Sequence, residues 1–308
     1  RILPFAGDSQ VLVYGTRPFY KTLHNYFQVA NKHIELWALT ASGKRIDLLN
    51  TGVAESVHVT VVGSVVAMND STSGSGFQVW DVDSGKTITQ TLAADAYLVG
   101  AAPHGFVYDQ TAGGKDHLFE ESFAGKVTDL GVPPTPNPNY RFTVGPDGII
   151  AGDDSGNGPP TEVPLYMTWA HPGKWRLLHR AHATWCSDLG KSYAACGRIV
   201  PLDGAKPITP QHYHCTGVQM IFHSAMVRIC SSGKLHRNSI TGKASISRRA
   251  YANQGVIHAF NKLIVGSPSQ SKLETLTSIN AKPKTLLTAA ASASGADLGV
   301  GAVAHRVG

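Results

Sequence analysis

A short turn motif returns along the whole chain and constrains its fold more than any other feature. Most copies contain a glycine and all end in a lysine: ASGK at 41–44, DSGK at 83–86, FAGK at 123–126, HPGK at 171–174, LDGAK at 202–206, ITGK at 240–243 and NAKPK at 280–284. Successive turn glycines are separated by 42, 40, 48, 31 and 38 residues. One four-stranded propeller blade takes about 40 to 45 residues. The spacing therefore predicts seven blades.

The segments between these turns have the composition of buried strands. Residues 64–70 (SVVAMND), 105–110 (GFVYDQ) and 148–154 (GIIAGDD) combine β-branched and small residues, which suit a strand covered on both faces. The chain has 32 Gly and 17 Pro, and only 16% of its residues are charged, which argues against surface helices. We predict an all-β protein in which residues 1–308 form a single propeller domain of four-stranded antiparallel blades, closed by the terminal strands.

Two copies of the turn carry a family resemblance. Residues 77–86 (FQVWDVDSGK) resemble the turn between the third and fourth strands of WD40 and quinoprotein-like propellers, and residues 35–44 (ELWALTASGK) are similar to them. Trp37, Trp80 and Trp169 lie where that family keeps an aromatic packing residue, so the resemblance implies a role in blade packing for them. It implies a fold and no activity.

The four cysteines form two pairs, each flanking a predicted hairpin. Opposite positions of an antiparallel hairpin allow a bridge, so we predict disulfides Cys186–Cys196 and Cys215–Cys230. Disulfides indicate an oxidising compartment, and we expect a secreted or extracellular protein. The abundance of Ala, Gly, Thr and Ser fits an exported bacterial protein. No run of about 18 apolar residues occurs, so membrane insertion is not expected.

Charge is distributed unequally along the chain. Residues 171–284 hold 16 Lys or Arg and three acidic residues, a local charge of +13, and the remainder carries −7. Neighbouring blades in sequence are neighbours in space, so we expect a basic half-ring beside an acidic one. The functional interpretation is an anionic partner, either a cell-surface glycan or polymer, a partner protein, or nucleic acid. The alternative is a dispersed, solvated surface.

Aromatic, His and Arg residues of blades four to seven gather in the connections between blades and in the loops after the second strands, on the face opposite the turn motif. Such side chains suit sugars, extended peptides and acidic groups. The predicted ligand-binding residues are Tyr140, His182, Trp185, His212, Tyr213, His214, Arg248, Arg249 and Tyr251. Ordinary packing between blades is the alternative interpretation for them.

Metal-binding patterns are weak. Asp153, Ser155 and Asn157 match the opening of a calcium loop, but Pro164 stands where the bidentate Glu would be needed, so a polar turn is the competing interpretation. His212 and His214 could share a metal with His182, but further ligands are missing. We expect no organic cofactor and keep calcium as a candidate.

These features favour a secreted, non-catalytic binding or scaffold propeller that recognises a glycan, an anionic polymer or a partner protein through the loop face of blades four to seven. A different class stays open, because propellers also host lyases, lactonases and glycosidases. For that class the candidate residues are His182, His212, His214 and Asp153 near the central channel.

Overall fold

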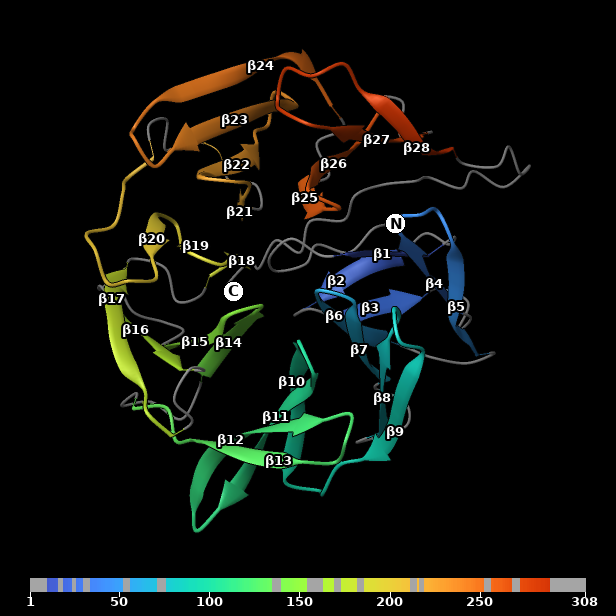
Figure 1. Ribbon diagram of the computed structural model, residues 1–308, viewed down its shortest axis with the longest axis vertical. Coiled ribbons are helices and arrows are strands. Elements are labelled where there is room, and N and C mark those ends of the chain that lie inside the picture. The colour runs from blue at the N-terminus through green and yellow to red at the C-terminus, as the bar shows by residue number, and fades with distance from the viewer. Residues whose placement is uncertain are drawn as a thin grey trace.

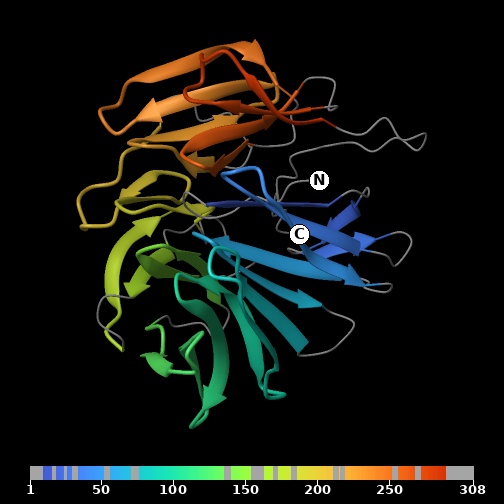
Figure 2. The ribbon, with the colours of Figure 1, turned by 45° about the vertical axis from the view of Figure 1, so that its right-hand side comes forward.

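The computed structural model shows a chain built from β-strands. It describes residues 10–15, 19–23, 26–29, 34–51, 56–70, 76–134, 140–153, 163–168, 173–181, 186–210, 215, 219–251, 256–267 and 272–288. Within these ranges every regular element is a strand. Figure 1 shows the sheets arranged in chain order around a common centre, and Figure 2 shows neighbouring sheets stacked face against face. The chain is therefore an all-β propeller.

Six successive blades follow the repeat, and we number them 2 to 7 after the turn motifs that they contain. Blade 2 contains β6 (Ser56–Val62), β7 (Val65–Asp70), β8 (Gly76–Asp81) and β9 (Lys86–Thr91). Blade 3 contains β10 (Ala96–Ala102), β11 (Gly105–Ala112), β12 (Lys115–Ser122) and β13 (Val127–Gly131). Blade 4 contains β14 (Tyr140–Gly145), β15 (Gly148–Asp153), β16 (Val163–Thr168) and β17 (Arg176–Ala181).

The basic part of the sequence forms the remaining three blades. Blade 5 contains β18 (Asp188–Leu189), β19 (Tyr193–Ala195) and β20 (Ile199–Pro201). Blade 6 contains β21 (Gln219–Ile221), β22 (Ala225–Ile229), β23 (Lys234–Ser239) and β24 (Ala244–Ala250). Blade 7 contains β25 (Val256–Ala259), β26 (Lys262–Gly266), β27 (Lys272–Leu276) and β28 (Lys284–Thr288). All strand pairs within the blades are antiparallel, as predicted.

The prediction of seven four-stranded blades is wrong at the N-terminus. Strands β1 (Val11–Gly15), β4 (Ile34–Thr40) and β5 (Arg45–Thr51) form a three-stranded sheet. The hairpin of β2 (Phe19–Leu23) and β3 (Tyr26–Val29) leaves this repeat and pairs with β6, so the sheet of blade 2 has six strands. The free edge of β6 offers unpaired backbone groups, and β3 satisfies some of them.

Blade 5 also departs from the predicted four strands. Its chain continues past β20, but only Ile208 pairs with Ile199, through an isolated antiparallel bridge. Pro207 and Pro210 flank Ile208, and proline cannot donate a backbone hydrogen bond to a ladder. The fourth strand is therefore reduced to one bridge.

The core lies between the blades. One apolar cluster joins the N-terminal sheet to blades 2, 6 and 7, and includes Trp37, Val66 and Leu263. Further clusters join blades 2, 3 and 4, blades 4 and 5, and blades 5 and 6. Trp37 is 6% exposed and Trp80 packs against the same cluster, as the resemblance implied, while Trp169 lies outside the described residues. Two terminal segments are candidates to close the ring, the strand at 1–15 and the tail at 299–308. The first is described from residue 10, and its β1 pairs with β4 of its own sheet, while the second lies outside the described residues, so closure of the ring stays a prediction.

The repeated turns occupy one structural position. They connect the third strand of a repeat to the outer strand, or to the outer segment in blade 5. The six turn glycines, at 43, 85, 125, 173, 204 and 242, all have φ between +73° and +88°. Glycine adopts this left-handed conformation without the steric cost of a Cβ atom, so the turn itself explains the repeat of this residue.

Both predicted disulfides are present. Cys186 is bonded to Cys196, with Cα atoms 4.0 Å apart, across the hairpin of β18 and β19. Cys215 is bonded to Cys230, with Cα atoms 4.7 Å apart, beside β21 and β22. Two disulfides are consistent with an extracellular protein. Within the described ranges of the chain, no helix is long and apolar enough to cross a membrane.

Candidate binding surface

Most of the predicted ligand-binding loops fall outside the described residues. This applies to His182, Trp185, His212, Tyr213 and His214, and also to Ser155 and Asn157 of the calcium pattern. Tyr140 is the first residue of β14 and Asp153 is the last residue of β15, and their backbones are paired across the hairpin. The calcium pattern, the metal candidate of His182, His212 and His214, and the candidate enzyme residues therefore stay predictions.

The three predicted residues of blade 6 have different environments. Tyr251 is 5% exposed and belongs to the apolar core, and burial is the main reason that its pKa is raised. This ring packs between blades, and its part in ligand binding stays a prediction. Arg248 and Arg249 are exposed on β24, the outer strand. The backbone N–H of Arg248 donates to Asn280 Oδ1 of blade 7 at 2.9 Å.

The described residues contain one geometric grouping of metal-ligand types. Atoms of Cys215, Cys230 and His236 lie within 4.8 Å of one another. Both sulfurs are bonded to each other in the disulfide, and a metal would need them as thiolates. We therefore assign this group to the disulfide and to the packing of blade 6.

Buried polar side chains link the inner strands of neighbouring blades. Asp188 of β18 is fully buried, and its Oδ2 accepts the backbone N–H of Ile221 in β21 at 2.6 Å. On the other side, Nδ1 of His258 in β25 lies 3.0 Å from the carbonyl oxygen of Ile221, a geometry in which the ring N–H donates. Similarly, the hydroxyl of Thr143 donates to the Cys186 carbonyl at 2.7 Å. These groups fix blade to blade along the inside of the ring.

The described part of residues 171–284 presents its basic residues on the surface. Thirteen of the 16 Lys and Arg residues are exposed: Lys174, Arg176, Arg180, Lys191, Lys206, Lys234, Lys243, Arg248, Arg249, Lys262, Lys272, Lys282 and Lys284. Of the three acidic residues, only Asp203 is exposed, because Asp188 is buried and Glu274 is partly buried. The unequal charge of the sequence is thus an unequal surface charge. The turn lysines within this set were not among the predicted site residues, although the turn motif itself contained the signal.

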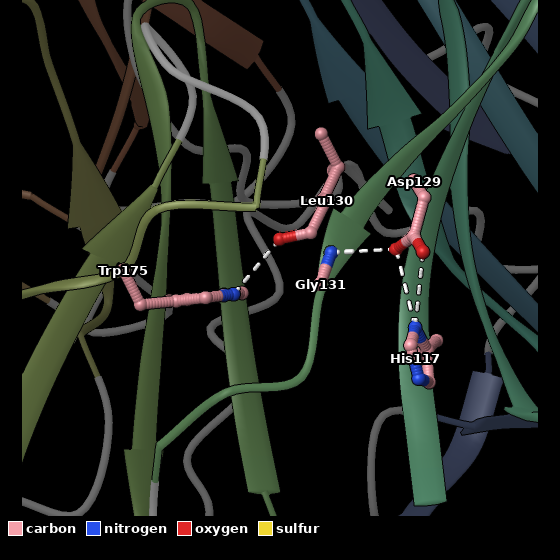
Figure 3. A network of polar contacts seen from close by, with 5 residues as sticks. All are labelled: His117, Asp129, Leu130, Gly131 and Trp175. Atoms are coloured by element: carbon pink, nitrogen blue, oxygen red, sulfur yellow. Dashed lines mark hydrogen bonds and ion pairs between the residues drawn. The ribbon is translucent and has the colours of Figure 1, made fainter. Parts of the chain in front are cut away.

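In the acidic half, a carboxylate at the end of blade 3 is hydrogen-bonded to neighbouring groups. Figure 3 shows His117 of β12 beside Asp129 of β13, with Nδ1 3.1 Å from Oδ2 and 3.3 Å from Oδ1. The same carboxylate accepts the backbone N–H of Gly131 at 2.7 Å. The next carbonyl, of Leu130, accepts the indole N–H of Trp175 from blade 4 at 2.9 Å. The end of β13 is therefore held both within blade 3 and by blade 4.

Two carboxyl groups of blade 3 have raised pKa values. Burial raises the pKa of Asp109 to about 6, with a further contribution from Asp116, while the backbone N–H of Tyr97 opposes the rise. Burial likewise raises the pKa of Glu120, and the nearby His104 and Lys126 oppose it. Perturbed carboxyl groups mark functional sites or simply buried positions. Here the hydrogen bond from Tyr97 N–H to Asp109, at 3.1 Å, indicates a role in the inner hairpin.

The sequence matches no protein-family model and no curated protein. By structure, the chain is similar to the β-propeller domain of the Trilobed protease from Pyrococcus furiosus, with a TM-score of 0.50 and 10% identity over 93% of this chain and 94% of that chain. It is also similar to a prolyl endopeptidase, with a TM-score of 0.55 and 14% identity over 92% of this chain and 48% of that chain. The chain thus spans about half of that enzyme.

A chain from a nidogen/laminin complex matches with a TM-score of 0.42 and 11% identity, over 89% of this chain and 92% of that chain. At 14% and 10% identity, the likeness to the prolyl endopeptidase and to the Trilobed protease domain shows the β-propeller fold alone, and this fold hosts unrelated functions. The WD40 and quinoprotein type of the repeats is not confirmed.

Proposed function

We propose that this propeller is a secreted, non-catalytic recognition module that binds an anionic partner through the basic surface of blades 4 to 7. The observation that carries the proposal is the exposure of thirteen Lys and Arg residues against a single exposed acidic residue in the described part of 171–284. Clustered positive charge raises the local concentration of anionic ligands and their rate of association. We keep the WD40 and quinoprotein-like resemblance of the turns as part of this proposal.

The acidic half explains why the surface would be selective. Arg45 lies 3.3 Å from Asp47 in the N-terminal sheet, and Lys126 of blade 3 interacts with Glu120. Cations with a carboxylate beside them attract a polyanion less, because the two charges largely cancel at the distance of a ligand. A polyanion would therefore prefer blades 4 to 7.

Binding of full-length heparin, as a generic polyanion, tests the proposal. The double variant Lys243→Glu/Lys284→Glu changes the charge of the basic half by −4, and Lys44→Glu/Lys86→Glu makes the same change in the acidic half. We expect the first variant to weaken binding by roughly a hundredfold and the second by less than about threefold, since each lysine near a charged surface contributes on the order of 1 kcal/mol. Equal losses would assign the effect to net charge alone and would contradict a localised surface.

A further inference from the structure

The turn lysines form a set with one member in every repeat. They are the final residues of the seven turns, Lys44, Lys86, Lys126, Lys174, Lys206, Lys243 and Lys284, and all are exposed. Because every turn lies at the same end of its repeat, the repeat that builds the fold also distributes these charges around the ring.

The surroundings of these lysines divide the set. In the first three repeats, Asp47, Asp83 and Glu120 lie within a few residues of the turn lysine. Around the turns of blades 4 and 6, the described segments 173–181 and 234–251 contain no acidic residue, and at the turn of blade 7 the partly buried Glu274 pairs with Thr285, next to Lys284. Blade 5 has Asp203, whose Oδ1 accepts the backbone N–H of Ala205 at 2.9 Å. Four successive turns thus carry lysines with little opposing charge.

Contacts between blades connect these four turns, together with the outer strand β24 of blade 6, into one strip. Arg176 lies two residues after Lys174, and its guanidinium donates to the Leu202 carbonyl of the blade 5 turn. The same group lies 3.9 Å from the point where a Cβ atom on Gly204 would be. Ile208, two residues after Lys206, packs on the same apolar cluster as Ile240 of the blade 6 turn. The turns of blades 4 and 5 are therefore in contact, and residues at the turns of blades 5 and 6 share one apolar cluster.

The last junction adds a second group of cations. The backbone N–H of Arg248 in β24 donates a hydrogen bond to Asn280 Oδ1 in the turn of blade 7. Asn280 stands two residues before Lys282 and four before Lys284. Arg248, Lys282 and Lys284 are all exposed. At the opposite end the strip stops at blade 3, where Asp129 lies on β13 next to the Trp175 contact with blade 4 (Figure 3). The strip is bounded on this side by negative charge.

The chemistry of the strip distinguishes between polyanions. Lysine ammonium groups act as mobile point charges that match sulfate or carboxylate groups repeated along a chain. Single-stranded nucleic acid is bound largely by stacking of its bases on aromatic rings. Among the residues of blades 4 to 7 whose side chains the structure describes, no Phe, Tyr or Trp is exposed. The described part of the strip therefore carries charge without exposed rings on which bases could stack.

We propose that an acidic polysaccharide lies along this strip and contacts the outer turns of blades 4 to 7 in succession. The inference rests on the proposed function and adds the class of polymer and its path. A ligand that reaches several turns at once gains affinity from the high effective concentration of each further contact. A short fragment that reaches one turn loses this gain.

Titration of the intact chain with three probes tests the inference: a heparin tetrasaccharide, full-length heparin, and single-stranded DNA with the same charge as the full-length heparin. We expect full-length heparin to bind roughly a hundredfold more tightly per chain than the tetrasaccharide, and at least about tenfold more tightly than the DNA. Lys174→Glu and Lys284→Glu, at the two ends of the strip, should each weaken binding of full-length heparin and leave the tetrasaccharide within about threefold. Lys86→Glu is the matched control in the acidic half and should change neither.

Each alternative outcome separates the two proposals. If no probe binds, the proposed function and the polysaccharide path are both overturned. Equal affinity for the tetrasaccharide and full-length heparin would overturn the path and leave anion binding intact. Tighter binding of the DNA would overturn the choice of polysaccharide.

Discussion

Blades 3 and 6 are built from the same four-stranded repeat, yet they are stabilised differently. In blade 3 a series of aromatic rings runs outward from the core, with centroid separations of 5.7 Å between Phe106 and Tyr108 and 5.4 Å between Tyr108 and Phe119. Blade 6 has a disulfide at the end of its second strand and, on its outer strand, exposed arginines. The comparison shows that the repeat fixes the buried strands and the turn glycine, while cross-links and surface charge vary from blade to blade.

The largest effect is expected from the aromatic series in the acidic half. Phe106 is fully buried and its ring lies 4.6 Å from that of Phe77 in blade 2. Phe106→Ala should lower the free energy of unfolding by about 3 to 5 kcal/mol, because it removes a buried ring between two blades. Phe119→Ala, at the partly exposed end of the series, should cost less. If chemical denaturation showed that both substitutions lower the free energy of unfolding equally, burial of Phe106 would not explain its contribution.

The matching effect in the basic half concerns its cross-links. Cys186 and Cys196 are buried beneath the short strands of blade 5. The double variant Cys186→Ala/Cys196→Ala should lower the free energy of unfolding by about 2 to 4 kcal/mol, since the unfolded chain loses a constraint. Denaturation in a reducing buffer is the control, because the wild-type protein and the variant should then differ much less. If the denaturation midpoint of the variant equalled that of the wild-type protein under oxidising conditions, the Cys186–Cys196 disulfide would not stabilise the fold.

A smaller effect with the opposite sign is expected at Asp109. Its pKa is about 6 in the folded chain, above the value of about 3.9 for an unfolded Asp. The folded state therefore binds more protons between about pH 4 and pH 6, and the ionised group reduces stability above that window. Asp109→Asn should raise the free energy of unfolding by roughly 1 to 2 kcal/mol at pH 7.5 and change it little at pH 4.

The exposed Asp95 provides the control for this substitution. Asp95→Asn should leave thermal unfolding almost unchanged at both pH values, because an exposed carboxylate is well solvated. A stabilisation by Asp109→Asn that is equally large at pH 4 would contradict burial of the ionised carboxylate as the cause.

The smallest effect is expected from the contact between His117 and Asp129 in blade 3, which is an ion pair only when the imidazole is protonated. The side chains of His117 and Asp129 are 26% and 51% exposed, so water and salt screen their attraction. Asp129→Asn should lower the free energy of unfolding by less than about 1 kcal/mol, and less again at high salt. A larger loss that salt does not change would mean that the contact to Gly131 N–H, and not the charge, holds the end of β13.

The repeated turns made most of the fold predictable from the sequence. Gly43, Gly85 and Gly125 mark a backbone conformation that other residues adopt at a cost, so their spacing reports the blade period directly. Both disulfides were also predictable, because each pair flanks one hairpin. The displaced β2–β3 hairpin was not, since local sequence does not determine which free strand edge a hairpin joins.

The surface was harder to predict than the fold. Aromatic and His residues in loops were predicted to bind a ligand, yet one of them, Tyr251, is part of the core. Burial of Asp188 also could not be read from the sequence, because it depends on the Ile221 N–H of the next blade. The total charge could be counted from the sequence. Contacts between blades, however, determine which side chains are exposed and which turns lie next to one another.

Hydrogen–deuterium exchange with and without full-length heparin is the most direct test of the central claim that blades 4 to 7 form the binding surface. The account predicts slower exchange at the described turn residues 173–174, 202–206, 240–243 and 280–284, with no change at the matching turns 41–44, 83–86 and 123–126. Protection spread equally over all seven turns, or confined to the acidic half, would contradict it.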